Sequence, residues 1–248
     1  MLALAAHSMK LFATPAPSAR QAPRIMLVQT PREISIRLPR TTLRGFLEMP
    51  ARCRGVVLFV HGSGSSRFSR RNRFVAEQLR AAELGTLLFD LLTPRESGVD
   101  EQTRHYRFDI RLLSQRVIDV LDWSLARHNL REHDIGLFGA STGAAAALVA
   151  AAERAQRVAA VVSRGGRPDL AGAALARVQA PTLLIVGTDD PEVLELNRDA
   201  AAQLRCEHRL DVISGASHLF EEPGTLAAAA AAAAAWFRKH LGATTNPR

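Results

Sequence analysis

Short apolar runs that alternate with helix-length segments are the feature of this 248-residue sequence that most restricts its fold. Uninterrupted runs rich in β-branched residues are typical of strands that a parallel sheet buries on both faces. Between them, apolar residues recur at spacings of three and four, which indicates helices. The alternation predicts an α/β fold, with a doubly wound, mostly parallel sheet and helices on both faces. The predicted strands are Val56–Val60, Thr86–Leu91, Ile135–Phe138, Val158–Val162, Thr182–Val186 and Arg209–Ile213, and the predicted helices lie at about 69–82, 108–128, 142–154, 192–204 and 224–241.

Two earlier segments, Ile34–Leu38 and Leu43–Glu48, alternate apolar and polar residues and predict an antiparallel addition at the sheet edge, for about eight strands in all. The 47% hydrophobic content is enough for one large core. We therefore expect a single domain over residues 32–241. Residues 1–31 are expected to be a disordered extension or the product of a start codon placed too early, and residues 242–248 a flexible tail.

The formal net charge of +8 comes almost entirely from the N-terminal part of the chain. Residues 1–54 hold nine Lys and Arg against two acidic residues, whereas residues 55–248 hold 23 against 22. No helix-turn-helix, zinc or aromatic-stacking pattern accompanies the charge, so we expect no nucleic-acid partner. The longest alanine run, 227–235, is shorter than the roughly 18 apolar residues that span a bilayer, so we expect no membrane partner.

The two cysteines, Cys53 and Cys206, lie far apart in the sequence, and neither has a CxxC or metal-ligand spacing. They are expected to be reduced thiols, which indicates a cytoplasmic location. No group of His, Asp and Cys has the spacing of a metal site. We therefore expect no metal and no other cofactor.

The pentapeptide Gly139-Ala140-Ser141-Thr142-Gly143 joins a predicted strand to an alanine-rich predicted helix. A G-x-S-x-G sequence at such a turn is typical of a nucleophile elbow, in which the turn lifts the seryl oxygen clear of the sheet. The alternative is that Ser141 is an ordinary helix N-cap with glycines for the turn. The pentapeptide alone does not decide between the two.

The ends of three other predicted strands carry residues that complete a catalytic site. In parallel sheets, binding and catalytic residues lie at the carboxyl ends of the strands. There the sequence has the turn His61-Gly62-Ser63-Gly64-Ser65-Ser66, the pair Asp189-Asp190, and His218. The order serine, acid, histidine is that of the α/β-hydrolases. This arrangement favours the catalytic interpretation of Ser141.

These residues have distinct predicted roles in acyl transfer. A serine hydroxyl needs a base, for which His218 is favoured, while His61 is expected to hold its turn by hydrogen bonding. Asp190 or Asp189 would orient the histidine, Asp190 being preferred, and the alternative for either is a helix N-cap. The backbone N–H groups of Ser63 and Thr142 are the expected donors to the oxyanion.

Five motifs together resemble the dienelactone-hydrolase-like branch of the α/β-hydrolases, and in particular bacterial proteins of that branch that occur alone or fused to a phosphoribosyltransferase domain. The resemblance covers about residues 32–241 and implies the α/β-hydrolase fold and a triad of Ser141, His218 and Asp190. Dienelactone hydrolases proper use a cysteine nucleophile, whereas this chain has Ser141, so lactone chemistry is not carried over with the fold. The motifs are HGSGSS (61–66), GASTG (139–143), VSRGGRPDLAG (162–172), LLIVG..D..VLELN (183–197) and GASHLFEEPG (215–224).

The expected activity is hydrolysis of a small ester or thioester by a serine hydrolase. An arginine near the strand ends that faces the crevice would favour a substrate with a carboxylate or phosphate, and the candidates are Arg67, Arg164 and Arg167. His61 is a further candidate for contact with the substrate. The charged connection Thr93–Asp109 is a candidate lid, with a solvated loop as the alternative. The alternatives to ester hydrolysis are a non-catalytic binding or regulatory module on the same scaffold and a lactone-type hydrolase.

Overall fold

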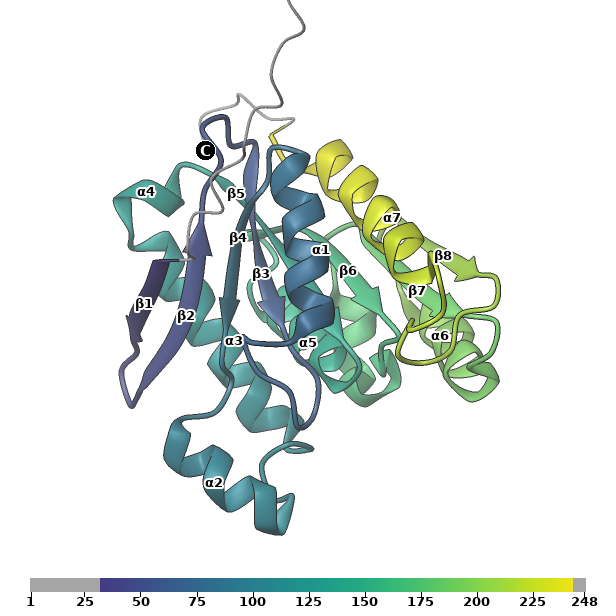
Figure 1. Ribbon diagram of the computed structural model, residues 1–248, viewed down its shortest axis with the longest axis horizontal. Coiled ribbons are helices and arrows are strands. Elements are labelled where there is room, and N and C mark those ends of the chain that lie inside the picture. Colours follow the sequence, from purple (N-terminus) through teal and green to yellow (C-terminus); the bar gives the residue numbers. More distant parts are fainter. Residues whose placement is uncertain (1–31, 243–248) are drawn as a thin grey trace, which may run out of the picture. The chain divides into compact units, whose positions relative to one another are not determined.

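The computed structural model describes residues 32–242 of the chain (Figure 1). These residues form an α/β unit in which strands and helices alternate along the chain. The predictions made for residues 1–31 and for the tail after Gly242 lie outside the described residues.

A single eight-stranded sheet forms the centre of the unit. Its order is β1-β2-β4-β3-β5-β6-β7-β8, and every neighbouring pair from β4 to β8 is parallel. Strand β2 is antiparallel to both β1 and β4, which confirms the prediction of an antiparallel strand at the N-terminal edge. The strands are β1 (Arg32–Arg37), β2 (Thr42–Glu48), β3 (Gly55–Val60), β4 (Gly85–Phe89), β5 (Asp134–Ala140), β6 (Val158–Arg164), β7 (Thr182–Gly187) and β8 (His208–Ile213).

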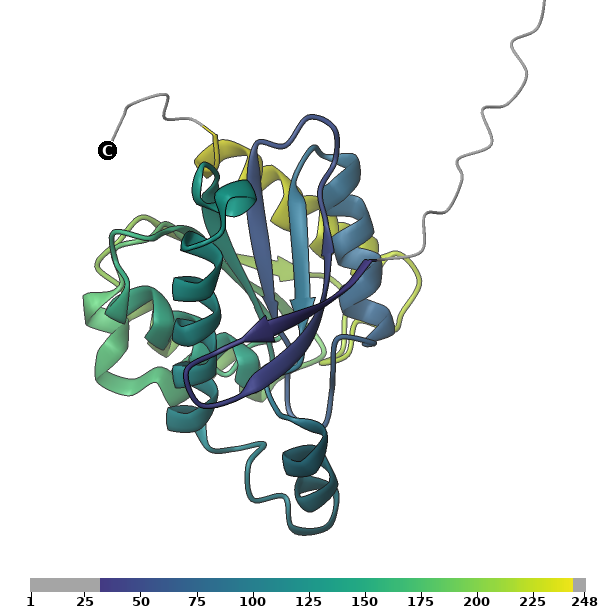
Figure 2. The same cartoon turned by 90° about the vertical axis from the view of Figure 1, so that its left-hand side faces the viewer.

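Helices cover both faces of the sheet (Figure 2). On one face, α1 and α7 pack on apolar side chains such as Val57, Phe59 and Phe138. On the other, α3, α5, α6 and η1 pack on side chains such as Leu58 and Leu137. The doubly wound arrangement is therefore confirmed. The helices are α1 (Arg70–Ala81), α2 (Pro94–Thr103), α3 (Ile110–Leu125), α4 (His128–Arg131), α5 (Thr142–Glu153), α6 (Pro191–Gln203) and α7 (Thr225–His240), with the 3-10 helix η1 (Pro168–Arg177).

The connection predicted over Thr93–Asp109 contains helix α2, which the spacing of apolar residues did not indicate. Thr93 and Glu96 form a reciprocal capping box, with Pro94 at the first helical position. Arg104 adopts a left-handed conformation and ends the helix. Capping rather than an apolar stripe thus starts this helix, which lies beyond the carboxyl ends of β3 and β4 (Figures 1 and 2).

The register of the parallel strands brings the predicted site segments to one edge. Val60 at the end of β3 pairs with Gly139 of β5, and Ala140 pairs with Arg164 of β6. Further along the sheet, Gly187 of β7 pairs with Ile213 of β8. The segments that carry the donor turn, Ser141, the acidic pair and His218 follow directly from these ends.

Candidate active site

Ser141 occupies a strained turn between β5 and α5. Its φ of 51° and ψ of −127° are unusual for a residue with a side chain and cost about 1–3 kcal/mol. Ser141 stands at the N-cap position, yet its side chain makes no capping hydrogen bond. The Ser141 side chain therefore does not cap α5.

The two glycines of the pentapeptide allow close backbone packing around Ser141. A Cβ on Gly139 would lie 2.4 Å from the Cα of Ala144, and one on Gly143 would lie 2.2 Å from the Val60 carbonyl oxygen. Both distances are far below van der Waals contact, so no larger residue fits either position without moving backbone. The close packing of this turn therefore requires both glycines of the motif.

Backbone hydrogen bonds tie the elbow to the end of β6. The Ser141 N–H donates to the Arg164 carbonyl at 3.3 Å, and the Arg167 N–H donates to the Ser141 carbonyl at 3.1 Å. The strained turn is thus held from both sides by the segment that follows β6. Such over-determination is what allows a strained conformation to persist.

His218 is bound to Asp190 rather than to Asp189. The distance from His218 Nδ1 to Asp190 Oδ2 is 2.7 Å, and the Asp190 side chain is only 14% exposed. Because an ionised carboxylate can only accept, Nδ1 is the protonated nitrogen and Nε2 is left as an acceptor. Asp190 also occupies the N-cap position of α6, but its side chain makes no capping bond there.

Asp189 has a different environment. Its side chain is exposed, and its Oδ1 accepts a hydrogen bond from the Thr188 hydroxyl at 3.0 Å. Its N–H donates to the Ala216 carbonyl, which ties the end of β7 to the loop that carries His218. Asp189 thus holds the loop through its backbone, while Asp190 contacts the imidazole.

The His218 ring lies beside the segment that follows β6. A Cβ on Gly165 would lie 3.1 Å from the His218 carbonyl oxygen and 3.8 Å from its ring atom Cε1. Gly165 directly follows Arg164, whose carbonyl accepts the Ser141 N–H. The imidazole therefore lies beside the end of β6 that holds the Ser141 backbone.

The donor turn is linked to the elbow by hydroxyl groups. Ser63 N–H donates to Thr142 Oγ1 at 3.0 Å, and the two hydroxyl oxygens are 2.8 Å apart. Because the Ser63 hydroxyl donates to the Arg107 carbonyl at 2.9 Å, the Thr142 hydroxyl is the donor between the two. Only the backbone N–H of Thr142 had a predicted role, but its side chain also orients the turn.

The segment after α2 is clamped onto the same turn. Asp100 Oδ1 accepts the N–H groups of Tyr106 and Arg107, and its Oδ2 accepts Arg107 Nε at 2.7 Å. This pairing positions the Arg107 carbonyl that accepts the Ser63 hydroxyl. No local sequence signal pointed to Asp100 or Arg107, because their role depends on a contact made across the fold.

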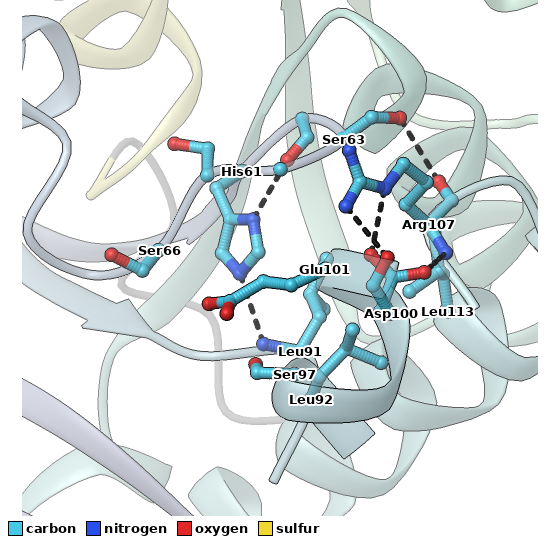
Figure 3. Close-up of a pocket in the computed structure, with 13 residues that line it drawn as sticks. His61, Ser63, Ser66, Leu91, Leu92, Ser97, Asp100, Glu101, Arg107 and Leu113 are labelled. Carbon is cyan, nitrogen blue, oxygen red and sulfur yellow. Dashed lines mark hydrogen bonds and ion pairs between the residues drawn. The ribbon is translucent and has the colours of Figure 1, made fainter. Parts of the chain in front are cut away.

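A cavity of about 270 Å³ lies between the donor turn and α2 (Figure 3). Ser141 is not among its lining residues, but Gly62 is, and a Cβ on Gly62 would lie 2.9 Å from the Ser141 Cβ. The turn therefore separates this cavity from the elbow. The lining residues are His61–Ser66, Leu91, Leu92, Ser97, Asp100, Glu101, Arg107 and Leu113.

His61 has a structural position within this arrangement. Its Nε2 accepts the Leu91 N–H at 3.0 Å, and its Nδ1 lies 3.0 Å from the Gly62 carbonyl. Both contacts are satisfied by a neutral ring with the proton on Nδ1. Burial lowers the pKa of His61 below its ordinary value, despite the opposing effects of the Gly62 carbonyl and Asp90. His61 therefore joins the donor turn to the end of β4.

The His61 ring predicts a stability difference that depends on pH. Since its folded-state pKa lies below 6.5, the unfolded chain binds the extra proton first, and stability falls as the pH drops below about 6.5. We expect His61→Leu to lose about 1–3 kcal/mol at pH 7.5, because the Leu91 N–H loses its acceptor. The difference between variant and wild type should shrink between pH 6.5 and 5 in denaturant titrations. A difference independent of pH would contradict the neutral ring.

Two of the three candidate arginines are paired with carboxylates. Arg67 binds Asp90 through both its backbone N–H and its guanidinium, and its Nη2 donates to Glu33 at 3.0 Å. Arg167 makes a two-pronged pair with Asp169 at 2.9 and 2.8 Å. Arg164 is buried and has no such partner among the described residues. Of the three, only Arg164 has an uncompensated charge at the strand ends.

The described residues contain neither a metal-ion cluster nor a membrane-spanning helix. No group of three or more His, Cys, Asp or Glu side chains within residues 32–242 is arranged to hold a metal ion. Of the helices in that part of the chain, none combines the length and apolar character needed to cross a bilayer.

Comparison with solved structures identifies the class of fold. A dienelactone hydrolase from Anabaena variabilis superposes with a TM-score of 0.84 at 54% identity, covering 85% of this chain and 99% of that one. Est1E from Butyrivibrio proteoclasticus has the same fold at 16% identity, with a TM-score of 0.70 over 84% of this chain and 98% of that one. The chain has an α/β-hydrolase fold.

The family follows from sequence comparison. The model of the dienelactone hydrolase family matches residues 73–241. The chain belongs to this family, whose fold is consistent with hydrolase activity. Relatives from two strains of Mycobacterium tuberculosis, which carry the name phosphoribosyl transferase, are 54% identical over 209 residues, covering 84% of this chain and 46% of the relatives. The chain thus spans about half the length of these curated relatives.

Proposed function

We propose that this protein is a serine hydrolase that cleaves a small ester or thioester through an acyl-enzyme. Ser141 is the nucleophile, His218 the general base and Asp190 the acid that orients the imidazole. The observation that carries the proposal is the 2.7 Å contact between His218 and Asp190 beside the segment that holds the strained Ser141 turn. Strain at a serine that caps no helix is otherwise difficult to explain.

The proposed reaction has two steps that use the same three residues. Ser141 Oγ attacks the acyl carbon while His218 Nε2 takes its proton, and Asp190 stabilises the imidazolium through Nδ1–H. His218 then protonates the leaving oxygen or sulfur, which departs and leaves the acyl group on Ser141. In the second step, His218 removes a proton from water, whose oxygen attacks the acyl carbon. The bond to Ser141 Oγ then breaks, His218 returns the proton to Oγ, and the free acid leaves.

Two backbone N–H groups are the proposed oxyanion donors. Thr142 is the first residue of α5, so its N–H has no acceptor within the helix. The Ser63 N–H donates to Thr142 Oγ1 at 3.0 Å. To stabilise an oxyanion, this N–H must donate to the oxyanion in place of the hydroxyl or in addition to it. The Thr142 hydroxyl therefore acts as a positioning group for Ser63, without touching the substrate.

We expect Thr142→Val to lower kcat about three- to tenfold at nearly constant KM, because a lost hydrogen bond of this kind contributes about 1 kcal/mol. Thr142→Ser, which keeps the hydroxyl, should retain most of the activity. Steady-state kinetics with 4-nitrophenyl acetate measure both parameters. An equal loss in the two variants would show that the methyl group and its packing, not the hydroxyl, matter.

A lactone is the second candidate substrate, since the solved relative at 54% identity is named dienelactone hydrolase. A lactone is an internal ester, so the same residues would open it, with the leaving oxygen kept on the product. A panel of 4-nitrophenyl acetate, an acetyl thioester and dihydrocoumarin compares the three substrate classes. Turnover of any member that depends on Ser141 supports the hydrolase, whereas a folded protein inert toward all three contradicts it and favours a binding module.

A further inference from the structure

Arg164 is a buried arginine at the carboxyl end of β6. Its residue exposure is 7%, and its guanidinium packs over the Phe220 ring, with Cζ 5.6 Å from the ring centroid. Its Nε and Nη1 are enclosed and have no hydrogen-bond partner among the described residues. A guanidinium has five N–H donors, and leaving donors of a charged group unpaired in the interior is costly.

The charge of Arg164 is likewise uncompensated. No described carboxylate forms an ion pair with it, whereas Arg67 and Arg167 are each paired. Burial, and secondarily the positive charge of Arg71, lower the pKa of Arg164 to about 10. The group is still protonated at neutral pH. An arginine in this environment would be stabilised by an anion, and the described residues do not supply one.

The position of Arg164 connects it to the proposed catalytic residues. It pairs in register with Ala140, the residue before Ser141, and its carbonyl accepts the Ser141 N–H. Phe220, over which the guanidinium packs, lies two residues after His218. Arg164 thus lies between the elbow and the loop of the proposed base.

We propose that Arg164 binds an anionic group, a carboxylate or a phosphate, on the substrate that Ser141 attacks. The substrate class is thereby narrowed to acidic esters or thioesters, and this assignment rests on the proposed function. Nη2 is the guanidinium nitrogen that is not enclosed, so it is the donor available to an oxygen of the anionic group. Arg71, whose own partner is Glu221 at 2.9 Å, adds positive potential on the same side.

Anion binding is tested without turnover in the full chain carrying Ser141→Ala. Its Tm is recorded against increasing inorganic phosphate, acetate and, as a neutral analogue of acetate, acetamide. We expect a saturable rise with at least one anion and none with acetamide, and the better anion identifies the group. No rise with either anion overturns the proposal. Binding by Ser141→Ala alongside an inactive wild type would instead contradict the proposed hydrolase and leave the anion site standing.

Variants then assign the effect to Arg164. In the Ser141→Ala background, Arg164→Met should abolish the anion-dependent rise, and Arg164→Lys should weaken it while keeping the charge. Arg177→Met is the control, because it removes an arginine that is 57% exposed and paired with Glu153. Without anions, Arg164→Met should be no less stable than its parent, since an uncompensated buried charge is removed. A rise that survives in Arg164→Met or in a folded Arg164→Lys at full strength overturns the assignment.

The active chain provides the kinetic comparison. We expect kcat/KM for mono(4-nitrophenyl) glutarate to exceed that for the neutral 4-nitrophenyl valerate by on the order of 10- to 100-fold, the range for hydrogen bonds to charged groups. Arg164→Met should remove this preference, lowering kcat/KM for the acidic ester by much more than that for the neutral ester. An equal loss for both esters would indicate a purely structural role and contradict the proposal.

Discussion

Ser141→Ala is expected to abolish ester hydrolysis while leaving the protein folded. Removal of an activated serine lowers kcat by on the order of 10³-fold or more, because no other group takes over the attack. The substitution also removes only one oxygen from a side chain that caps no helix, so we expect a change in stability of less than about 1 kcal/mol. Steady-state hydrolysis of 4-nitrophenyl acetate and thermal unfolding measure the two effects.

Ser65→Ala is the matched control for this substitution. Ser65 belongs to the donor turn, lines the cavity and is exposed, but it has no role in the proposed reaction. Its activity should stay within about twofold of wild type. Retention of wild-type turnover by Ser141→Ala would contradict the assignment of the nucleophile, whatever the control shows.

The adjacent acidic residues should differ strongly in their effect on turnover. Asp190→Asn is expected to lower kcat about 10³- to 10⁴-fold, because an amide at that position no longer holds the Nδ1–H tautomer of His218. Asp189→Asn should cost less than about threefold, since that side chain is exposed and bonded to Thr188. The two variants carry the same chemical change one residue apart.

Thermal unfolding of both variants separates a loss of turnover from a folding defect, because each substitution keeps the size of the side chain. Equal losses in the two variants would contradict the assignment of Asp190.

The strands and the main helices could be predicted because local patterns specify them. Val56–Val60 is a continuous apolar run, and it is buried throughout β3. The alanine stretch after Ser141 forms the buried helix α5. Hydrophobic burial selects apolar residues at these positions, and their spacing in the sequence indicates the strand or helix directly.

Helix α2 could not be predicted from that period, because Asp100 is its only buried residue. Its capping box, Thr93 to Glu96 with Pro94 between, is a local signal that could have been used. The pairing of Arg67 with Glu33 and Asp90 left no such signal, since its partners are 34 and 23 residues away. Charge pairs of this kind depend on the completed sheet rather than on neighbouring residues.

At the candidate site, sequence order placed the serine, acid and histidine segments at one sheet edge. The sequence favoured Asp190 over Asp189. The contact that distinguishes them, from Asp190 to His218, is seen only in the coordinates, because adjacent residues in a turn point in different directions. The unpaired guanidinium of Arg164 could not be predicted from the sequence. It is defined by what surrounds the side chain, and burial without a partner is a property of the fold.

The most direct test of the proposed mechanism is covalent labelling with a fluorophosphonate probe, followed by peptide mass spectrometry. An activated serine reacts with this probe, whereas a capping or solvent-exposed serine does not. The account predicts one adduct per chain on Ser141, prevented by prior denaturation and greatly slowed in Asp190→Asn. A folded, unlabelled protein, or an adduct on another residue, would contradict it.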